Sequence, residues 1–280
     1  MRIANVNNRA LLLVDDSSGL DIAHASAGKF APEIESVYRD WDAFVRWAST
    51  HPTGEITSFA DTEVGAPSPS PRQVFAIGLN YRNHAAESGF AEPDTPPVFT
   101  KFVSCITGPV TDVPLPEGHV DWEVELVVVV GKGGRNILVE EAWDAVAGFT
   151  LGQDISERIL QAAGPSPQFS LGKSHDGFGP TGPWLATRDE FANPNAIAIG
   201  CTVNGEERQS GSTRDLIFDV PDLVSRLSAV TNLYPGDLIF TGTPEGVGLG
   251  RKPQVWLSDG DELLSWGEGL GQLRQRLIAQ

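Results

Sequence analysis

One run of twelve residues constrains the fold more than any other part of this chain. Residues 120–131 read VDWEVELVVVVG, an apolar, β-branched stretch that is typical of a buried β-strand ended by glycine. Because side chains alternate between the two faces of a strand, Asp121, Glu123 and Glu125 are expected on one face and the apolar residues on the other. The run therefore predicts a strand with closely spaced carboxylates on a single face.

The two glutamates of this run need an explanation. Carboxylates two residues apart on one face repel each other and lose solvation where the strand becomes apolar. A basic side chain or a bound metal would compensate, and oxygen ligands suit Mg²⁺, Mn²⁺ or Ca²⁺. A solvated edge strand with an acidic outer face accounts for the same pattern without a metal. Glu123 and Glu125 alone leave both interpretations open.

Composition limits the class of protein. The chain has 280 residues, of which 40% are hydrophobic and 20% charged, as in a globular protein of one or two domains. A net charge of −17 without a basic patch argues against nucleic-acid and membrane partners, and an anionic substrate would need a local positive centre such as a divalent metal. Two cysteines without CxxC spacing, and no apolar leader or 18-residue apolar run, predict a cytoplasmic protein.

The chain divides at a proline-rich segment. Residues 65–71 (GAPSPSP) are predicted to be a linker, because alternate prolines disfavour helix and sheet. We expect a small β-rich N-terminal domain over residues 1–66 and a catalytic domain over 67–280. Strand and helix patterns do not alternate regularly, which favours a mixed β-rich α+β roll or sandwich over a doubly wound sheet. The expected strands are 10–14, 74–77, 98–102, 124–130, 148–151, 196–203, 238–241 and 262–266, and the expected helices 40–50, 81–88, 139–146, 155–162 and 221–231.

A third acidic residue lies where a strand pattern changes to a helix pattern. Residues 152–161 read GQDISERILQ. Asp154, followed three residues later by Glu157, forms a good helix N-cap with a capping-box partner. The same Asp154 is also a candidate third carboxylate ligand for the metal. Both interpretations remain open at this level.

A histidine and a glutamate share one face of a predicted short helix. His84 and Glu87 are three residues apart in a helix that Gly89 is expected to end. A carboxylate beside an imidazole fixes its tautomer and raises its basicity, which suits a general base acting on water. A surface histidine with a helical neighbour explains the spacing equally simply.

Two glycine-rich turns complete the set of candidate sites. Lys173 lies in LGKSHDGFGP (171–180), where it could hold a substrate carboxylate or an oxyanion, or be an ordinary solvated lysine. Residues 241–248 (TGTPEGVG) follow a strand pattern, and their backbone N–H groups could cradle an anion or form only a tight turn.

Taken together and in order, these segments resemble the fumarylacetoacetate hydrolase family. The matching stretches are GLNYRNHAAESG (78–89), PPVFTKF (96–102), DWEVELVVVVGK (121–132), GFTLGQDISERILQ (148–161), LGKSHDGFGPTGPWL (171–185), VNGEERQSGSTRDLIF (203–218) and PGDLIFTGTPEGVG (235–248). The resemblance implies a mixed β-roll catalytic domain with a small N-terminal domain, assembled as a homodimer. It also implies that Glu123, Glu125 and Asp154 bind Mg²⁺ or Mn²⁺, with Ca²⁺ able to replace them in crystals.

The resemblance also implies the catalytic residues. His84 and Glu87 would form the acid–base pair on a mobile lid helix, and Lys173 would hold the substrate and its oxyanion. The implied substrate contacts are Arg158, Gln161 and Thr243. The chain departs from the usual family pattern at Gln153, Glu157 and His175, where many relatives have Asn, Ala and Phe.

The chemistry expected from this set is hydrolytic C–C cleavage of a 2,4-dioxo acid, an acylpyruvate. The metal would chelate the carboxylate and 2-oxo oxygen of this small anionic oxo acid, His84 would activate water, and Lys173 would stabilise the oxyanion. Oxaloacetate decarboxylation or oxo-acid isomerisation would use the same metal without water. A non-catalytic metal-binding module is a third reading, against which the His84–Glu87 pair and Lys173 argue.

Overall fold

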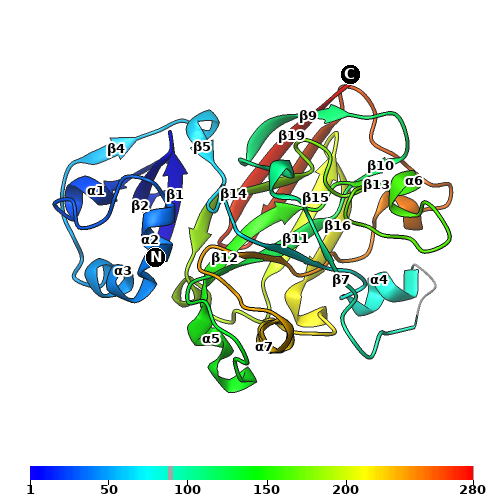
Figure 1. The fold of residues 1–280 in the computed structure, drawn as a ribbon. Coiled ribbons are helices and arrows are strands. Elements are labelled where there is room, and N and C mark those ends of the chain that lie inside the picture. Colours follow the sequence, from blue (N-terminus) through cyan, green and yellow to red (C-terminus); the bar gives the residue numbers. More distant parts are fainter. Residues whose placement is uncertain (88–90, 280) are drawn as a thin grey trace.

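The predicted strand forms the centre of a large sheet. The computed structural model describes residues 1–87 and 91–279 (Figure 1). Strand β11 (Val124–Val130) lies between β12 (Val146–Gln153) and β17 (Leu238–Phe240), and all seven of its residues are buried. Its even-numbered residues enter one hydrophobic core, whereas Val127 and Val129 enter a second core on the opposite face. The alternation is confirmed, and the edge-strand interpretation is wrong.

The run that the sequence presents as one strand is two strands. Strand β10 (Val120–Asp121) pairs with β13 (Ser156–Glu157), separately from the main sheet. Where β10 gives way to β11, the Glu123 N–H donates to the side-chain oxygen of Gln153 at 2.9 Å. The Val124 N–H donates to the side-chain oxygen of Gln209 at the same distance. Side-chain oxygens thus replace the backbone acceptors of a neighbouring strand at this point. Glu123 therefore lies between the β10–β13 pair and the β11–β12 pair.

The main sheet is mixed and extends on both sides of β11. Within the described residues it has 12 strands, with a path of β4-β3-β2-β1-β14-β12-β11-β17-β6-β7. The remaining strands on this path are β4 (Ile56–Ser58), β3 (Ser18–Asp21), β2 (Arg9–Asp15), β1 (Arg2–Val6), β14 (Gly179–Ala186), β6 (Val74–Ile77) and β7 (Val98–Thr100). Beside the path, β5 (Val64–Gly65) pairs with β1 and β8 (Ile106–Thr107) with β14.

A second sheet of five strands contributes the other wall of the first core. Its order is β16-β15-β18-β19-β9, and its apolar residues join those of β11 and β12 in one hydrophobic cluster. Its strands are β16 (Glu206–Ser212), β15 (Ala198–Val203), β18 (Glu262–Gly267), β19 (Gly271–Ala279) and β9 (Val110–Leu115). The mixed, β-rich α+β class is therefore confirmed.

The N-terminal unit continues the main sheet. Strand β1 pairs with β14, and three helices beside it pack against the second core (Figure 1, blue). These helices are α1 (Ile22–Ala25), α2 (Glu35–Arg39) and α3 (Trp41–Ala48). The proline-rich segment is not a loose spacer, because Ser68 is buried and its hydroxyl donates to the Gly236 carbonyl at 2.6 Å.

The other helices are short and lie at the periphery. They are α4 (Arg82–Glu87), α5 (Ala142–Ala145), α6 (Arg158–Gln161) and α7 (Val220–Val230). Helices α3 and α7 confirm the predicted 40–50 and 221–231, with Asp40 and Asp219 as N-caps. The expected ends of the 81–88 helix at Ser88 and Gly89 lie outside the described residues. No helix in the described ranges has the length and hydropathy needed to cross a bilayer.

Candidate active site

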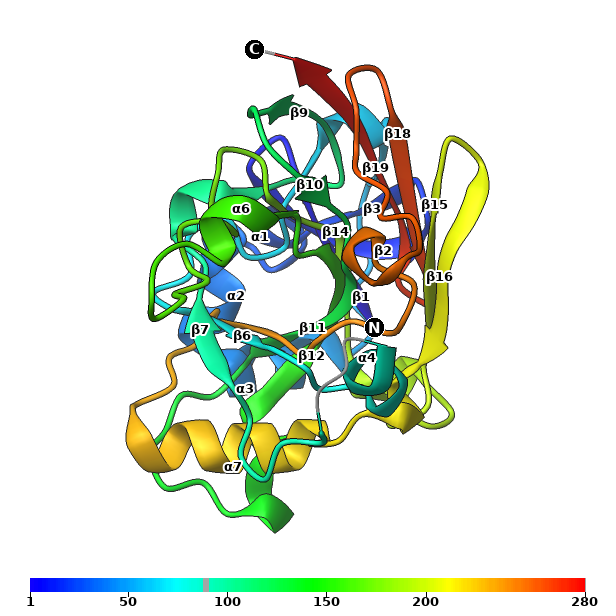
Figure 2. The same cartoon turned by 90° about the vertical axis from the view of Figure 1, so that its right-hand side faces the viewer.

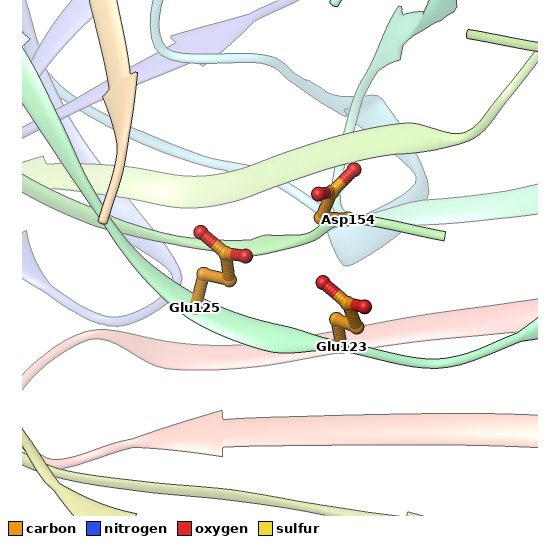
Figure 3. A group of neighbouring side chains, drawn as sticks. All are labelled: Glu123, Glu125 and Asp154. Carbon is orange, nitrogen blue, oxygen red and sulfur yellow. The ribbon is translucent and has the colours of Figure 1, made fainter. Parts of the chain in front are cut away.

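Sheet pairing brings three buried carboxylates together. Strand register places Glu125 opposite Gly152, and the backbone N–H of Asp154 donates to the Glu123 carbonyl at 2.9 Å. One oxygen atom from each of Glu123, Glu125 and Asp154 lies within 4.8 Å of the others (Figure 3). All three residues are buried. The structure thus groups the three predicted ligands around one point.

Asp154 does not cap the helix that follows it. The chain remains extended after Asp154 through β13, and α6 begins only at Arg158. Its N-cap is Glu157, whose carboxylate accepts hydrogen bonds from the N–H groups of Ile159 and Leu160 at 3.0 and 2.6 Å. The capping interpretation of Asp154 is wrong, and its carboxylate is left to face the cluster.

The two glutamates of the cluster titrate in opposite directions. Burial, together with the nearby charges of Asp154 and Glu123, raises the pKa of Glu125 well above 4.5. Burial also acts to raise the pKa of Glu123, but the cations Lys173 and Arg158 outweigh it and lower that pKa to about 2. Without a metal, the cluster therefore combines an ionised Glu123 with a Glu125 that favours its protonated form.

Two buried lysines form ion pairs with the carboxylates of the cluster. The Lys173 ammonium lies 2.8 Å from a Glu123 oxygen and 2.6 Å from an Asp154 oxygen. Burial acts to lower the pKa of Lys173, but Asp154 and Glu123 raise it overall. Lys101 was missed from the sequence, although it lies within the PPVFTKF stretch; its ammonium is 2.6 Å from the other Asp154 oxygen. Asp154 is thus held between two buried cations.

Arg158 links the cluster to a fourth buried acid. Its guanidinium donates to Asp121 at 2.6 and 2.9 Å and lies 2.7 Å from Glu123. Asp121 also accepts hydrogen bonds from the N–H groups of Gly248 and Leu249 at 2.7 and 3.0 Å. This network ties the turn after β17 to the carboxylate cluster.

His84 and Glu87, the predicted acid–base pair, lie beside each other on α4. The Nδ1 atom of His84 lies 3.6 Å from a Glu87 carboxylate oxygen, and His84 is 8% exposed. Glu87 also accepts a hydrogen bond from the Gly246 N–H at 3.1 Å. Partial burial acts to raise the pKa of Glu87, but its contacts with His84 and Gly246 lower it overall. An ionised Glu87 is therefore available to orient His84.

The turn after β17 contacts the cluster through its backbone and through Thr243. The N–H of Gly242 donates to Glu125 at 2.7 Å. The Thr243 hydroxyl donates to the Val124 carbonyl at 2.8 Å and accepts from Gln209 at the same distance. This turn is therefore more than a tight connection, since one of its N–H groups supports a carboxylate of the cluster.

All these groups meet at one cavity of about 1020 Å³. Figure 2 shows α4, α6 and β7 on the same side of the molecule, around the ends of β11 and β12. Glu125 and Asp154 are fully covered beneath the cavity. The predicted site residues that line it are His84, Glu87, Glu123, Arg158, Gln161, Lys173 and Thr243.

The residues present fit a hard divalent cation. Three carboxylates at mutual ligand distance are the donor set that Mg²⁺ and Mn²⁺ prefer. The like charges that raise the pKa of Glu125 are the charges that such a cation would offset. Glu123, Glu125 and Asp154 would hold it.

Comparison with known proteins agrees with this geometry. The family model described as fumarylacetoacetate (FAA) hydrolase C-terminal matches residues 73–278. The chain belongs to this family. Its β-roll fold is shared with solved members of the family. A Mycobacterium smegmatis protein assigned to HpcE superimposes with a TM-score of 0.95 at 51% identity, and the match covers 100% of this chain and 99% of that one.

Curated relatives in the family carry out different reactions. The chain is 43% identical to the human mitochondrial oxaloacetate tautomerase FAHD2A, over 81% of this chain and 71% of that protein. It is 45% identical to the 2,4-didehydro-3-deoxy-L-rhamnonate hydrolase of a Sphingomonas strain, over 76% and 75%. Family membership therefore leaves the reaction open.

One solved relative contains a metal. The maleylpyruvate hydrolase of Sphingobium sp. SYK-6, in complex with manganese(II) and pyruvate, superimposes with a TM-score of 0.80 at 27% identity, covering 100% of this chain and 99% of that one. The expected Mg²⁺ or Mn²⁺ cofactor thus has support from the carboxylate cluster and from a relative.

Proposed function

We propose that the chain is a divalent-metal-dependent hydrolase that cleaves a C–C bond in a 2,4-dioxo acid of the acylpyruvate type. One observation carries the proposal: His84 and Lys173 line the same cavity as Glu123, a member of the carboxylate cluster. Mg²⁺ or Mn²⁺ bound by this cluster would supply positive charge for the substrate carboxylate and 2-oxo group.

The protein's own groups would handle the proton and the developing charge. His84, oriented by Glu87 at 3.6 Å, would take a proton from water as the oxygen attacks C4. The Lys173 ammonium would stabilise the resulting oxyanion. Cleavage of the C3–C4 bond leaves its electron pair on C3, which takes the proton from His84. The products are a carboxylic acid and pyruvate.

Three further residues would position the substrate. Arg158 and Gln161 lie on one wall of the cavity and are joined by a hydrogen bond of 3.0 Å, while Thr243 lines it from the turn after β17. Because the Arg158 guanidinium is already paired with Asp121 and Glu123, Arg158 and Gln161 are proposed to contact the substrate as one hydrogen-bonded unit.

The hydrolase relative supports cleavage of this substrate type. A 2,4-didehydro-3-deoxy aldonate carries oxo groups at C2 and C4 with a methylene between them. Hydrolysis on that carbon framework is the reaction class proposed here, and the enzyme that performs it shares 45% identity with this chain.

A second candidate is a proton-transfer or decarboxylation reaction of an oxo acid without water. The 43% identity to an oxaloacetate tautomerase favours it. His84 would then move a proton between C3 and the 2-oxo oxygen of oxaloacetate, and no acyl group would leave. Isomerisation of an unsaturated oxo acid belongs to the same alternative.

Two substrates separate these candidates. The purified protein is supplied with Mn²⁺ and either acetylpyruvate or oxaloacetate. Hydrolysis predicts loss of the diketone enol absorbance with release of acetate and pyruvate in equal amounts. Persistence of acetylpyruvate, together with enol–keto exchange or CO₂ release from oxaloacetate, would reject the hydrolase in favour of the second candidate.

We also infer a homodimer, a division into residues 1–66 and 67–280, and a cytoplasmic location. The family resemblance supports the first two, and two buried free thiols at Cys105 and Cys201 suit a reducing compartment. Light scattering on the purified protein tests the assembly.

A further inference from the structure

The cavity extends far beyond the charged centre. Its volume of about 1020 Å³ corresponds to pockets that enclose drug-sized ligands, whereas pyruvate would occupy only the end beside Lys173. Besides the charged groups, its wall includes the apolar residues Leu79, Pro167, Phe169 and Leu249. The site therefore offers room and apolar surface for a part of the substrate that does not react.

The apolar wall begins directly beside the reacting end. The Lys173 ammonium lies 5.2 Å from the centre of the Phe99 ring. The Phe99 and Phe169 rings pack edge to face with 5.6 Å between their centres. A Cβ atom on Gly78 would lie 3.9 Å from the Phe169 ring, so the backbone just before Leu79 passes beside this ring. Phe99, Phe169 and Leu79 all line the cavity that Lys173 also lines.

Leu79 has a backbone conformation that leucine disfavours. Its φ angle is 50°, in the left-handed region. The residues on both sides are held in place: the Gly78 N–H donates to the Pro97 carbonyl, and the Asn80 side-chain amide donates to the Thr241 carbonyl at 2.7 Å. Glycine would adopt the same conformation without strain. Strained residues of this kind cluster at functional sites. A leucine where glycine would be unstrained therefore indicates that the Leu79 side chain has a role in the cavity.

Two further basic residues line the cavity, Arg251 and Lys252, but they do not form an anion site. The Arg251 guanidinium already donates to the backbone carbonyls of Arg208 and Gly246, at 2.9 and 3.2 Å. Lys252 is exposed, so its charge is solvated. A second carboxylate on the substrate could pair only with Lys252, whose charge is screened by solvent. An apolar group would instead contact the apolar side chains of the wall.

We propose that this cavity selects oxo acids whose far end is apolar, an aryl group or an alkyl chain of several carbons. Leu79, Phe169 and Leu249 form the surface that binds this group. The inference rests on the proposed function for the reacting 2-oxo acid end and adds the class of acyl group.

Binding of three non-cleavable acids tests the inference without turnover. Pyruvate, 2-oxoglutarate and 2-oxo-4-phenylbutanoate are titrated calorimetrically into the protein with Mn²⁺. The phenyl acid is expected to bind at least about tenfold more tightly than pyruvate, because its ring is removed from water. The distal carboxylate of 2-oxoglutarate is expected to give no comparable gain.

Leu79→Gly is the decisive variant, since glycine at this φ preserves the fold. It is expected to lower the ratio of phenyl-acid to pyruvate affinity about tenfold. Ala27→Gly is the matched control, because Ala27 has a φ of 52° in an exposed turn outside the cavity, and its ratio should equal that of the wild type.

The outcomes separate the two proposals. Pyruvate binding with no gain for the phenyl acid, an unchanged ratio in Leu79→Gly, or tighter binding of 2-oxoglutarate overturns the apolar wall and leaves the reacting end intact. Failure of all three acids to bind overturns both proposals. Failure of acetylpyruvate hydrolysis combined with the expected binding pattern rejects only the hydrolase.

Discussion

Two glutamates on one face of one strand have opposite protonation preferences because of what surrounds each of them. Glu123 contacts Lys173 and Arg158, whereas the Glu125 carboxylate accepts an N–H bond from Gly242 and lies near two acids. Local spacing alone predicts that both are crowded, but it contains no information about which one receives the cations. That distinction arises from segments distant in the chain.

Metal binding is expected to release a proton from Glu125. The pKa of Glu125 is raised in the metal-free protein, so below that pKa the carboxyl holds a proton that the cation must displace. Metal affinity should therefore increase with pH up to this pKa and then become constant. Calorimetry of Mn²⁺ binding in buffers of different ionisation enthalpy counts the protons. Identical proton release from Glu125→Gln would contradict the assignment.

Lys173→Ala is expected to lower kcat on the true 2,4-dioxo acid by about 10²–10³, because one oxyanion donor is lost. Activity is measured at saturating Mn²⁺, since Lys173 also contacts two of the carboxylates. Lys132→Ala is the matched control, because Lys132 is half-exposed and pairs with Asp42 on the surface. Wild-type turnover in Lys173→Ala would remove this lysine from the mechanism.

The residues of the site were predictable to different degrees. Glu123 and Glu125 could be found from spacing, because period-two alternation is a local property. Lys101 could not, because its partner Asp154 is 53 residues away and only sheet pairing joins them. Asp154 could not be assigned from spacing alone, because Asp-x-x-Glu also suits a helix start; in the structure Glu157 is the cap instead.

At the scale of elements, the turn after β17 holds α4 in place. The Gly246 N–H donates to Glu87, and a Cβ atom on Gly250 would lie 2.5 Å from the carboxyl carbon of Glu87. This close approach allows the Glu87 carboxylate to lie against the turn and beside His84. Only glycine at position 250 leaves this space free.

Gly250→Ala is expected to displace the Glu87 carboxylate and lower hydrolytic kcat by roughly 10–10² through misorientation of His84. The fold should persist, because the group that must move is the end of a flexible side chain. Steady-state kinetics and thermal unfolding are measured side by side. Gly54→Ala, whose Cβ meets only ordinary contacts, serves as control; equal kinetics in the two variants would refute the role of this approach.

Strands were predicted better than short helices. The strands of the main sheet have apolar, β-branched patterns that local sequence expresses directly, and β11 agrees with its predicted bounds. The helix expected over 155–162 is shorter in the structure, Arg158–Gln161, because pairing between β10 and β13 keeps the chain extended until Glu157. Such non-local pairing has no local sequence signal.

At the scale of the whole molecule, the cation site joins buried residues of separate strands and loops and should contribute to stability. Removing the metal with EDTA is expected to abolish turnover and to lower the free energy of unfolding by about 2.7 kcal/mol, relative to protein with free Mn²⁺ at ~100 times its Kd. Urea unfolding with and without Mn²⁺ measures the difference. Full activity after complete metal removal, verified by elemental analysis, would refute metal dependence.

The position of β11 also limits how this protein can change. Both faces of the strand are buried, and its register against β12 aligns the carboxylates. A single inserted residue within β11 would exchange the contents of both hydrophobic layers and turn the acidic groups away from each other. Tolerance to insertion should therefore be confined to the loops at the cavity mouth, so the lining of the cavity can be redesigned there while the carboxylate cluster keeps its alignment.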